Sequence, residues 1–320
     1  MHEAKAKRTR EAYAMAWRQF TTWCEGHGRN SLPCSPETLA AWLVALAEGN
    51  DGGKPRARAT ISQYASAVIS AQRAAGYQFD RQHAVLKSTL AGINRVKAET
   101  ETVKKAQPLL GQDLHALLMG LRAQIPADAR DGALLGLGWA GALRRNELVS
   151  LDWNEIGTGK GYVSADERGV EIVLMRSKAS QDNAVTIAIP LTDAPSVHFW
   201  LSQWARVAKL EPGQPVFRAV DRRQRIAEQR LGDGSVSTIV KSRVKAYALL
   251  KGKSKVEANE LVQRFSGHSM RAGFATTAAD ADVPLSRLAL HTRHKSLETL
   301  QGYVRSAEQW RKSALKGLGF

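Results

Sequence analysis

The strongest constraint on the fold is a change in the spacing of apolar residues near the middle of the chain. In the first hundred residues, apolar side chains recur every three or four positions, which places them on one face of an α-helix. Four stretches show this spacing: residues 7–28, 35–49, 58–77 and 81–99. Ser35 starts the second stretch and is a good helix N-cap residue. The pattern predicts a small bundle of four helices.

The segment KAETETVKKAQPLL, residues 97–110, is charged and has no apolar period. It predicts a linker between an N-terminal helical domain at 1–104 and a C-terminal domain at 105–320. Beyond the linker, helical spacing returns at about 111–123 and 128–149.

Three stretches between residues 161 and 190 are rich in Val, Ile and Tyr and nearly alternate apolar with polar side chains: GYVSAD, VEIVLMRS and NAVTIAIP. They predict a small antiparallel sheet, with SKASQDN as the turn between its second and third strands. Helices are expected again from about residue 194 to the end, interrupted by EPGQPVF and GDG. The expected fold class is mainly α, with a small antiparallel β-sheet in the C-terminal domain.

The charge of the chain indicates the class of its partner. There are 46 Lys and Arg residues against 30 Asp and Glu residues, a net charge of +16. Such a field attracts polyanions, and DNA or RNA is the first candidate. The alternative is a soluble basic protein without such a partner, but basic residues recur in every segment and do not form one detachable tail.

Other features argue against several classes of protein. No apolar run is long enough to span a bilayer, so no membrane partner is expected. The basic start of the chain lacks the apolar core of a secretory signal. Cys24 and Cys34 lie outside any Cys/His ligand spacing, which argues against a zinc site or a disulfide framework. We expect a cytoplasmic, nucleoid-associated protein.

Two pairs of residues spaced three apart are candidate site residues. In GALRRNEL, Arg144 and Glu147 share one helix face and follow a long apolar run, where an arginine needs a partner or a ligand. The alternative is a surface ion pair worth a few tenths of a kcal/mol. In FSGHSMRAGF, His268 and Arg271 have the same spacing and could present an imidazole and a guanidinium to one phosphate, although HxxR also arises by chance.

Lys178 and Tyr303 are single candidates. Lys178 lies in the predicted turn, where a lysine is either solvated or placed to give a proton to a leaving oxygen. Tyr303 follows His294 by nine residues. It is a packed aromatic, a base-stacking platform or a nucleophile.

Together these residue types suit the displacement of a phosphodiester. Two arginines can bind phosphate oxygens as permanently charged bidentate donors. A tyrosine, whose ordinary pKa is about 10, needs positive surroundings or a base before it attacks, and histidine and lysine can transfer the protons. We expect phosphoryl transfer through a covalent phosphotyrosine, with no metal and no cofactor.

The ordered set resembles the active-site signature of the tyrosine recombinases, the integrase family of site-specific DNA recombinases. It comprises Arg144, Glu147, Lys178, His268, Arg271, His294 and Tyr303. The N-terminal stretches AWRQFTTWCEGHGRN and TISQYASAVISAQRAAGYQF resemble the Cre-like branch. Two positions depart from the pattern: Cre has tryptophan where this chain has His294, and Arg293 stands where many members have glycine.

The resemblance implies a role for each residue. Arg144 and Arg271 would bind the scissile phosphate, and Glu147 would brace the pocket. Lys178 would be the general acid toward the leaving 5′-hydroxyl.

The remaining roles concern the nucleophile. His268 would assist deprotonation of Tyr303, and His294 would hydrogen-bond the phosphate. Tyr303 would form a 3′-phosphotyrosyl link, which keeps the energy of the ester so that the strands rejoin without ATP.

The resemblance also implies an assembly. It is a two-domain, C-shaped clamp on double-stranded DNA with inverted-repeat half-sites, a homotetrameric synapse and a Holliday-junction intermediate. The final stretch, SAEQWRKSALKGLGF, would be a helix that docks into a neighbouring subunit or, alternatively, folds back onto its own domain.

Two basic stretches are expected to contact DNA. SVSTIVKSRVKAYALLKGK reads as a helix suited to a major groove or, alternatively, as a solvated helix. One face of it would present Ser237, Thr238, Lys241 and Lys245. In the N-terminal domain, KPRARATISQY would present Lys54, Arg56 and Arg58.

Two other functions remain open from the residues. A type IB topoisomerase would use similar chemistry to relax DNA without sequence choice. A DNA-binding protein with a decayed catalytic set is the non-enzymatic alternative, although every position of the set holds a competent residue.

Overall fold

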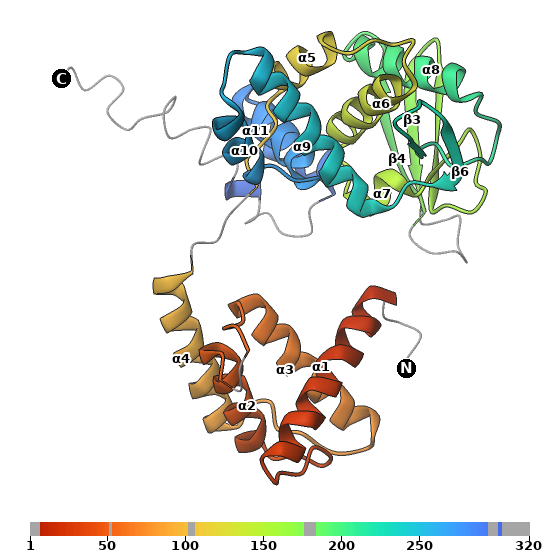
Figure 1. Ribbon diagram of the computed structural model, residues 1–320. Helices are drawn as coiled ribbons and strands as arrows, with labels where there is room; N and C mark the ends of the chain where they lie inside the picture. The colour runs from red at the N-terminus through yellow and green to blue at the C-terminus, as the bar shows by residue number, and fades with distance from the viewer. Residues whose placement is uncertain (1–6, 51–52, 102–105, 176–183, 294–299, 303–320) are drawn as a thin grey trace. The chain divides into compact units, whose positions relative to one another are not determined.

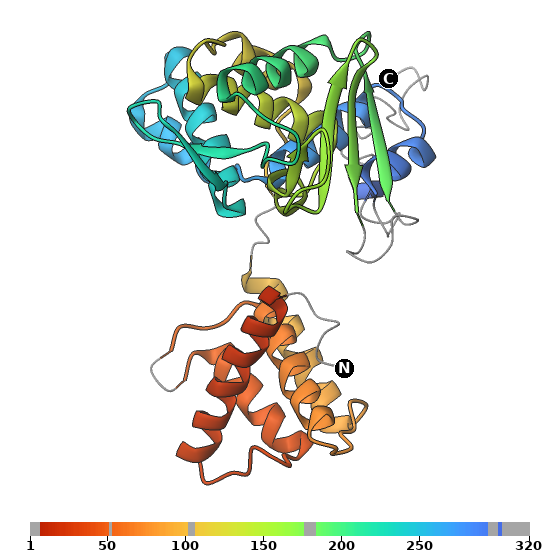
Figure 2. The ribbon, with the colours of Figure 1, turned by 90° about the vertical axis from the view of Figure 1, so that its right-hand side faces the viewer.

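The computed structural model describes residues 7–50, 53–101, 106–175, 184–293 and 300–302. The chain divides into two compact units, the N-terminal unit Met1–Val103 and the C-terminal unit Lys104–Phe320 (Figure 1). Within the described ranges both units are mainly helical, and the strands belong to the C-terminal unit (Figures 1 and 2). No helix in these ranges is long and apolar enough to cross a membrane.

The described part of the N-terminal unit is a bundle of four helices, as the apolar spacing predicts. These are α1 (Lys7–Gly26), α2 (Pro36–Glu48), α3 (Arg58–Ala74) and α4 (Ala84–Thr100). The predicted cap of α2 is confirmed, because the backbone N–H of Thr38 donates to Oγ of Ser35 at 3.2 Å. This bond satisfies one of the donors that a helix start leaves without a partner.

Aromatic rings fill the centre of this bundle. The buried Trp42 of α2 contacts Phe20 of α1 and Tyr64 of α3, with ring centroids 5.0 Å and 5.7 Å apart. Cys24 and Cys34 are free thiols in the same core. Burial raises the pKa of Cys34 to about 12, so its thiol is protonated and unreactive at neutral pH.

Helix α6 (Pro126–Ala140) forms the centre of the C-terminal unit. It is buried along most of its length and packs along α8 (Pro195–Ala208) (Figure 1). The close approach requires glycine, since a Cβ at Gly132 would lie 2.4 Å from the ring of Trp200. The other helices of the described ranges are α5 (Gly111–Met119), α7 (Arg145–Val149), α9 (Asp233–Leu250), α10 (Lys255–Gln263), α11 (His268–Asp280) and α12 (Leu285–Thr292).

The helical pattern predicted over about 128–149 is broken at residues 141–144. Helix α6 ends at Ala140, and Ala142 has a φ of +44°, outside the right-handed helical region. The chain therefore turns, and Arg144 becomes the N-cap residue of α7. This turn, residues 141–144 between α6 and α7, is termed the α6–α7 turn.

A four-stranded sheet packs against α8. Its strands are β1 (Leu151–Trp153), β2 (Gly161–Asp166), β3 (Gly169–Leu174) and β4 (Val185–Pro190), paired in chain order. The predicted antiparallel pairing of β2, β3 and β4 is confirmed, with Ile172 opposite both Val163 and Ile187. Strand β1, which the sequence did not predict, pairs parallel with β2 and makes the sheet mixed.

A second sheet of two antiparallel strands, β5 (Arg218–Val220) and β6 (Ile226–Arg230), interrupts the helices expected after residue 194. That expectation was wrong because both strands are short and lack an apolar period. Arg230 donates to the carbonyl of Leu151 at 3.0 Å and forms an ion pair with the fully buried Asp152. These contacts join β6 to β1.

The last residues of the predicted linker are fixed against the end of α10 and the start of α11. The backbone N–H of Gln107 donates to the carbonyl of Arg264 at 2.7 Å, and that of Leu109 donates to the carbonyl of Ser269 at 2.9 Å. A Cβ at Gly273 of α11 would lie 1.7 Å from the oxygen of Leu109, so only glycine permits this approach.

A buried ionic network joins α6 to α9. Arg243 of α9 contacts Asp131 at 2.6 Å and Asp128 at 2.8 Å, and Asp131 also pairs with Arg130 at 2.6 Å. The network fixes α9, the helix predicted to read DNA, to the central helix of the unit.

Candidate active site

The α6–α7 turn holds the first pair of predicted site residues. The backbone N–H of Arg144 donates to Oε2 of Glu147 at 2.9 Å, and its Nη1 donates to Oε1 at 2.7 Å. The pair therefore forms across the start of α7. The sequence had instead suggested a pair along one continuous helix. The side chain of Arg144 is 46% exposed, so its guanidinium is open to a ligand while one edge is held.

Glu147 is shared by two arginines. Its Oε2 also accepts from Nη2 of Arg293 at 3.1 Å. Burial acts to raise the pKa of Glu147, but the hydrogen bonds from Arg144 and the charges of Arg293 and Arg144 outweigh it and hold the pKa below its usual range. The carboxylate is ionised at neutral pH and orients both guanidinium groups.

Arg271 reaches the same turn from α11. Its side chain is buried, its Nη1 donates to the carbonyl of Ala142 at 2.6 Å, and its Nη2 donates to the carbonyl of Thr292. Nη2 of Arg293 also donates to the carbonyl of Ala142, at 3.2 Å. The guanidinium groups of Arg271 and Arg293 thus meet at one backbone oxygen.

His268 begins α11 beside this cluster. Its side chain is exposed on one side. Partial burial of the ring lowers its pKa below the ordinary 6.5, and the positive charges of Arg271, Arg144 and Arg145 lower it further. The imidazole is therefore neutral at neutral pH and able to accept a proton.

The structure thus brings four predicted site residues together: Arg144, Glu147, His268 and Arg271. The other three, Lys178, His294 and Tyr303, lie outside the described residues, as does the predicted C-terminal helix. Strands β3 and β4 pair antiparallel on either side of the connection that contains Lys178, so the predicted hairpin itself is present.

Sequence reasoning missed the contribution of His291. Its Nε2 is 2.6 Å from the carbonyl oxygen of Ala140, and its ring stacks on Phe274 at 4.5 Å. Burial is the main cause that lowers its pKa, which keeps the ring neutral. His291 therefore contacts the end of α6 from α12.

One of the residues predicted to contact DNA on α9 is engaged within the protein. Oγ of Ser237 accepts from the backbone N–H of Gly267 at 3.1 Å and from Nη1 of Arg145 at 3.3 Å. It links α9 to α7 and to the start of α11. The other three predicted contacts on α9 are exposed or half-buried: Thr238, Lys241 and Lys245.

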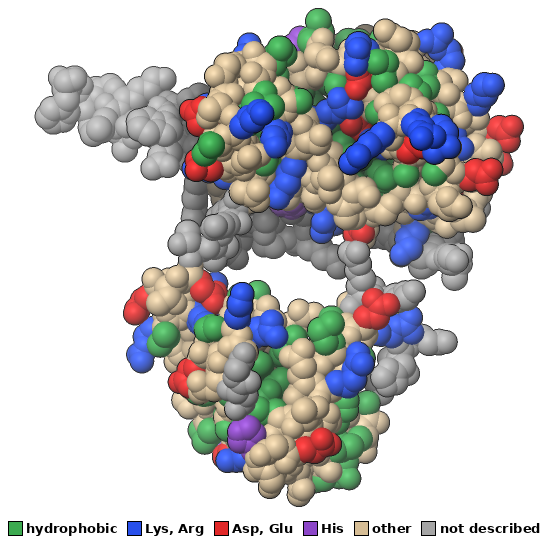
Figure 3. Space-filling view, viewed as in Figure 1, with side chains coloured by type: hydrophobic (Ala, Val, Ile, Leu, Met, Phe, Trp, Pro, Cys, Tyr) green, Lys and Arg blue, Asp and Glu red, His purple; other side chains and the backbone are tan. Residues whose placement is uncertain are grey.

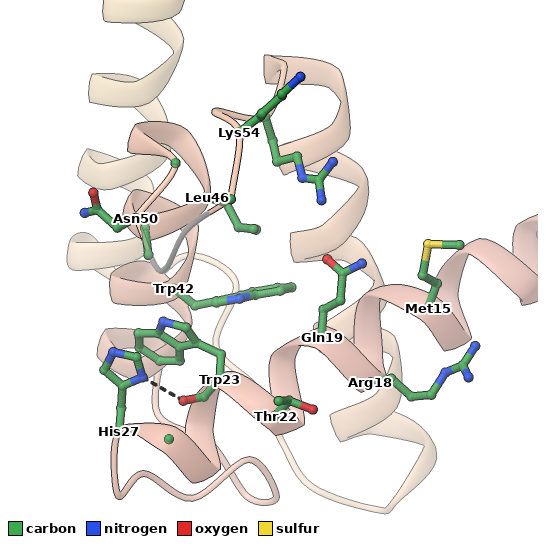
Figure 4. A pocket seen from close by; sticks show the side chains of 15 residues that line it. Met15, Arg18, Gln19, Thr22, Trp23, His27, Trp42, Leu46, Asn50 and Lys54 are labelled. Atoms are coloured by element: carbon green, nitrogen blue, oxygen red, sulfur yellow. Dashed lines mark hydrogen bonds between the residues drawn. The ribbon is translucent and has the colours of Figure 1, made fainter.

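The predicted DNA contacts of the N-terminal unit lie before and at the start of α3. Lys54, Arg56 and Arg58 are all exposed. Lys54 and Arg56 also line a pocket of about 760 Å³. In Figure 4 the ring of Trp42 lies across the middle of this pocket, with Lys54 on one side and Trp23 on the other.

Basic side chains are not confined to these predicted contacts. Figure 3 shows Lys and Arg spread over the visible face of the C-terminal unit. This distribution agrees with the net charge of +16 and suits the backbone of a nucleic acid.

Comparison with known proteins identifies the family and the fold. The model of the phage integrase family matches residues 109–309, a range that includes every residue of the predicted catalytic set. The chain belongs to the phage integrase family. The resemblance to tyrosine recombinases drawn from the ordered site residues is thereby confirmed.

Relatives of this phage integrase family member share nearly its full length. An integrase/recombinase xerD homolog of Selenomonas ruminantium is 32% identical over 321 residues, covering 98% of this chain and 86% of that protein. A tyrosine recombinase of Synechococcus elongatus is 28% identical over 317 residues, covering 95% and 86%. The similarity to these relatives therefore extends into the N-terminal unit.

Solved structures share the fold. XerH recombinase in a post-cleavage complex with a palindromic difH substrate has a TM-score of 0.59 at 16% identity, covering 90% of this chain and 73% of that one. A lambda integrase fragment, solved as a dimer bound to a COC′ core site, has a TM-score of 0.54 at 17% identity, covering 94% and 89%. The mainly helical fold with small sheets is that of the tyrosine recombinases.

Proposed function

We propose that this enzyme is a site-specific DNA recombinase that cleaves and rejoins duplex DNA through a 3′-phosphotyrosyl link to Tyr303. The observation that carries the proposal is the convergence of Arg144, His268 and Arg271 at the α6–α7 turn, where the ionised Glu147 holds Arg144. The names printed for the relatives, integrase and tyrosine recombinase, agree with it.

The arginines stabilise the charge that develops on the phosphate. In the displacement, negative charge grows on the non-bridging oxygens, where fixed guanidinium groups stabilise the transition state more than the ground state. Arg144 offers its open side to one oxygen, while Glu147 fixes its direction. Arg271 approaches from α11. Because this charge is balanced by side chains and the ester energy is retained, the reaction proceeds without metal or ATP.

Histidine and lysine move the protons. The neutral His268 takes the phenolic proton as Tyr303 attacks, because its lowered pKa leaves a lone pair at neutral pH. Lys178 donates a proton to the leaving 5′-oxygen, and His294 hydrogen-bonds the phosphate. Rejoining reverses these transfers, with a 5′-hydroxyl attacking the phosphotyrosine.

DNA recognition uses both units. Lys54, Arg56 and Arg58 bind the backbone from the N-terminal unit, and α9 enters the major groove with Thr238 and Lys241. We propose that two units of one chain clamp one half-site and that four copies on paired inverted repeats exchange strands through a Holliday junction. Such an enzyme works on the nucleoid.

Covalent capture tests the proposal and identifies the target. The purified protein is incubated with genomic DNA of the source organism, with and without EDTA, stopped with detergent, and the attached DNA is sequenced. Adducts at a few sites flanked by inverted repeats are expected in both conditions. Scattered adducts would favour the topoisomerase, and the absence of adducts from a folded protein that binds DNA would favour the non-catalytic alternative.

Tyr303→Phe is the matched variant for this experiment. It removes the nucleophilic oxygen and nothing else, so it should abolish covalent adducts while DNA affinity stays within about twofold. Gel shift and detergent-resistant complexes measure the two properties separately. Adduct formation by the Phe variant would refute the assignment of Tyr303.

A further inference from the structure

We infer that Arg293 is a positioning residue of this site: its guanidinium fixes Glu147 against the α6–α7 turn and thereby sets the direction of Arg144. The inference rests on the proposed function, because it concerns the same phosphate-binding arginines. It assigns a task to a residue that is absent from the predicted catalytic set.

The backbone of Arg293 is the first observation. It ends α12 in the left-handed region, with φ +55° and ψ +40°. Glycine is the usual residue at such a helix end, because a Cβ disfavours this conformation. A long cationic side chain in this position indicates that its contacts offset the backbone strain.

The side-chain contacts are the second observation. The side chain of Arg293 is only 12% exposed. Its Nη1 donates to the carbonyl oxygens of His291 at 2.9 Å and Gly141 at 3.2 Å. Its Nη2 donates to the carbonyl oxygen of Ala142 at 3.2 Å and to the carboxylate oxygen Oε2 of Glu147 at 3.1 Å. One guanidinium therefore joins the end of α12, the α6–α7 turn and α7.

The division of the Glu147 oxygens shows how the effect reaches Arg144. Oε1 accepts from Nη1 of Arg144, whereas Oε2 accepts from the backbone of Arg144 and from Arg293. Arg293 thus holds the oxygen that does not bind the Arg144 guanidinium. Without it, the carboxylate is held by the backbone and guanidinium of Arg144 alone, and the direction of both side chains is less fixed.

The carbonyl of Ala142 extends the effect to Arg271. Both arginines donate to this oxygen, Arg271 at 2.6 Å and Arg293 at 3.2 Å. Arg293 therefore contacts the acceptor of one phosphate-binding arginine and the carboxylate partner of the other. The side chain of Arg293 therefore links the surroundings of Arg144 to those of Arg271.

The test uses the full-length protein and a duplex that carries a site recovered by covalent capture. Arg293→Met removes the guanidinium, and Arg293→Gly also relieves the strain of the left-handed backbone. A loss of cleavage rate in both variants is therefore caused by the loss of the side chain. Arg287→Met is the matched control, because Arg287 is an exposed arginine on α12. Single-turnover adduct formation at saturating DNA and the Kd of the duplex are measured for each.

Both Arg293 variants should form the adduct roughly tenfold to a hundredfold more slowly, the size of effect that a small displacement of a catalytic group produces. Their Kd should stay close to that of the wild type, and Arg287→Met should cleave at the wild-type rate. Because removing a guanidinium from a poorly solvated ion pair also lowers stability, the rates are compared at a temperature at which all variants are folded. Adding Arg293→Met to Glu147→Gln should slow the reaction by a smaller factor than Arg293→Met does in the wild type, because both changes break the contact through Glu147.

The outcomes separate this inference from the proposed function. Wild-type rates in both Arg293 variants, or rate losses that multiply with that of Glu147→Gln, would overturn the positioning role and leave the recombinase proposal intact. A wild-type protein that forms no adduct would overturn the proposed function, and the inference with it.

Discussion

Removing Arg243 should destabilise the C-terminal unit strongly. Its guanidinium joins α9 to α6 through Asp131 at 2.6 Å and Asp128 at 2.8 Å. The side chains of Arg243, Asp128 and Asp131 are only 19%, 11% and 6% exposed. Arg243→Ala therefore leaves two carboxylates in a poorly solvated place without their shared cation.

The structure sets the size of this effect. Breaking a buried ion pair by removing one partner costs about 3–5 kcal/mol, mostly because a charge stays buried without its partner. Each carboxylate here keeps a second contact, Asp131 with Arg130 at 2.6 Å and Asp128 with the backbone N–H of Arg122 at 3.1 Å. The lower end of the range applies, so we expect a loss of about 3 kcal/mol.

Urea and thermal unfolding followed by circular dichroism measure the loss. For a unit of this size, 3 kcal/mol corresponds to a fall in Tm of about 6–12 °C. Arg225→Ala is the control: Arg225 and Asp221 pair at 2.7 Å but are 73% and 39% exposed, and such pairs contribute at most about 1 kcal/mol. If Arg243→Ala costs no more than Arg225→Ala, the buried network does not stabilise the unit as argued.

Three further predictions concern pH, packing and salt. Because the pKa of His268 is lowered and its neutral form is the base, the cleavage rate should fall as the pH decreases through a midpoint below 6.5; Arg145→Ala removes one of the charges that lower it and should move that midpoint upward. Gly132→Ala places a Cβ 2.4 Å from the ring of Trp200 and should destabilise the C-terminal unit by about 1–3 kcal/mol, which denaturant unfolding would show. DNA affinity should fall steeply as salt increases, because several phosphates are neutralised; a flat salt titration would contradict DNA binding through the basic residues.

The sequence predicts best where one physical signal dominates. Regular apolar spacing placed all four helices of the N-terminal bundle, and Ser35 marked the start of α2. Alternation and β-branched residues placed β2, β3 and β4. The order of competent side chains predicted the family and the four site residues that meet at the α6–α7 turn.

The sequence predicts poorly where tertiary contacts decide. The break at Ala142 follows apolar residues that continue the helical pattern, and its positive φ is held by contacts from α11 and α12. Strands β5 and β6 are short and polar, so they depend on partners such as Asp152, which is distant in sequence from Arg230. The helical spacing of Ser237 did not reveal that its hydroxyl joins α9 to α7 and α11.

The segment 107–109 determines where the chain can be divided to exchange its DNA-binding domain. Gln107 and Leu109 hydrogen-bond next to the start of α11, and Nε1 of Trp139 donates to the carbonyl of Leu109 at 2.8 Å. A catalytic fragment that begins after Leu109 loses these bonds beside the helix that carries His268 and Arg271. A chimera with a foreign DNA-binding domain should therefore be joined before Gln107, so that target choice changes and the catalytic helix keeps its support.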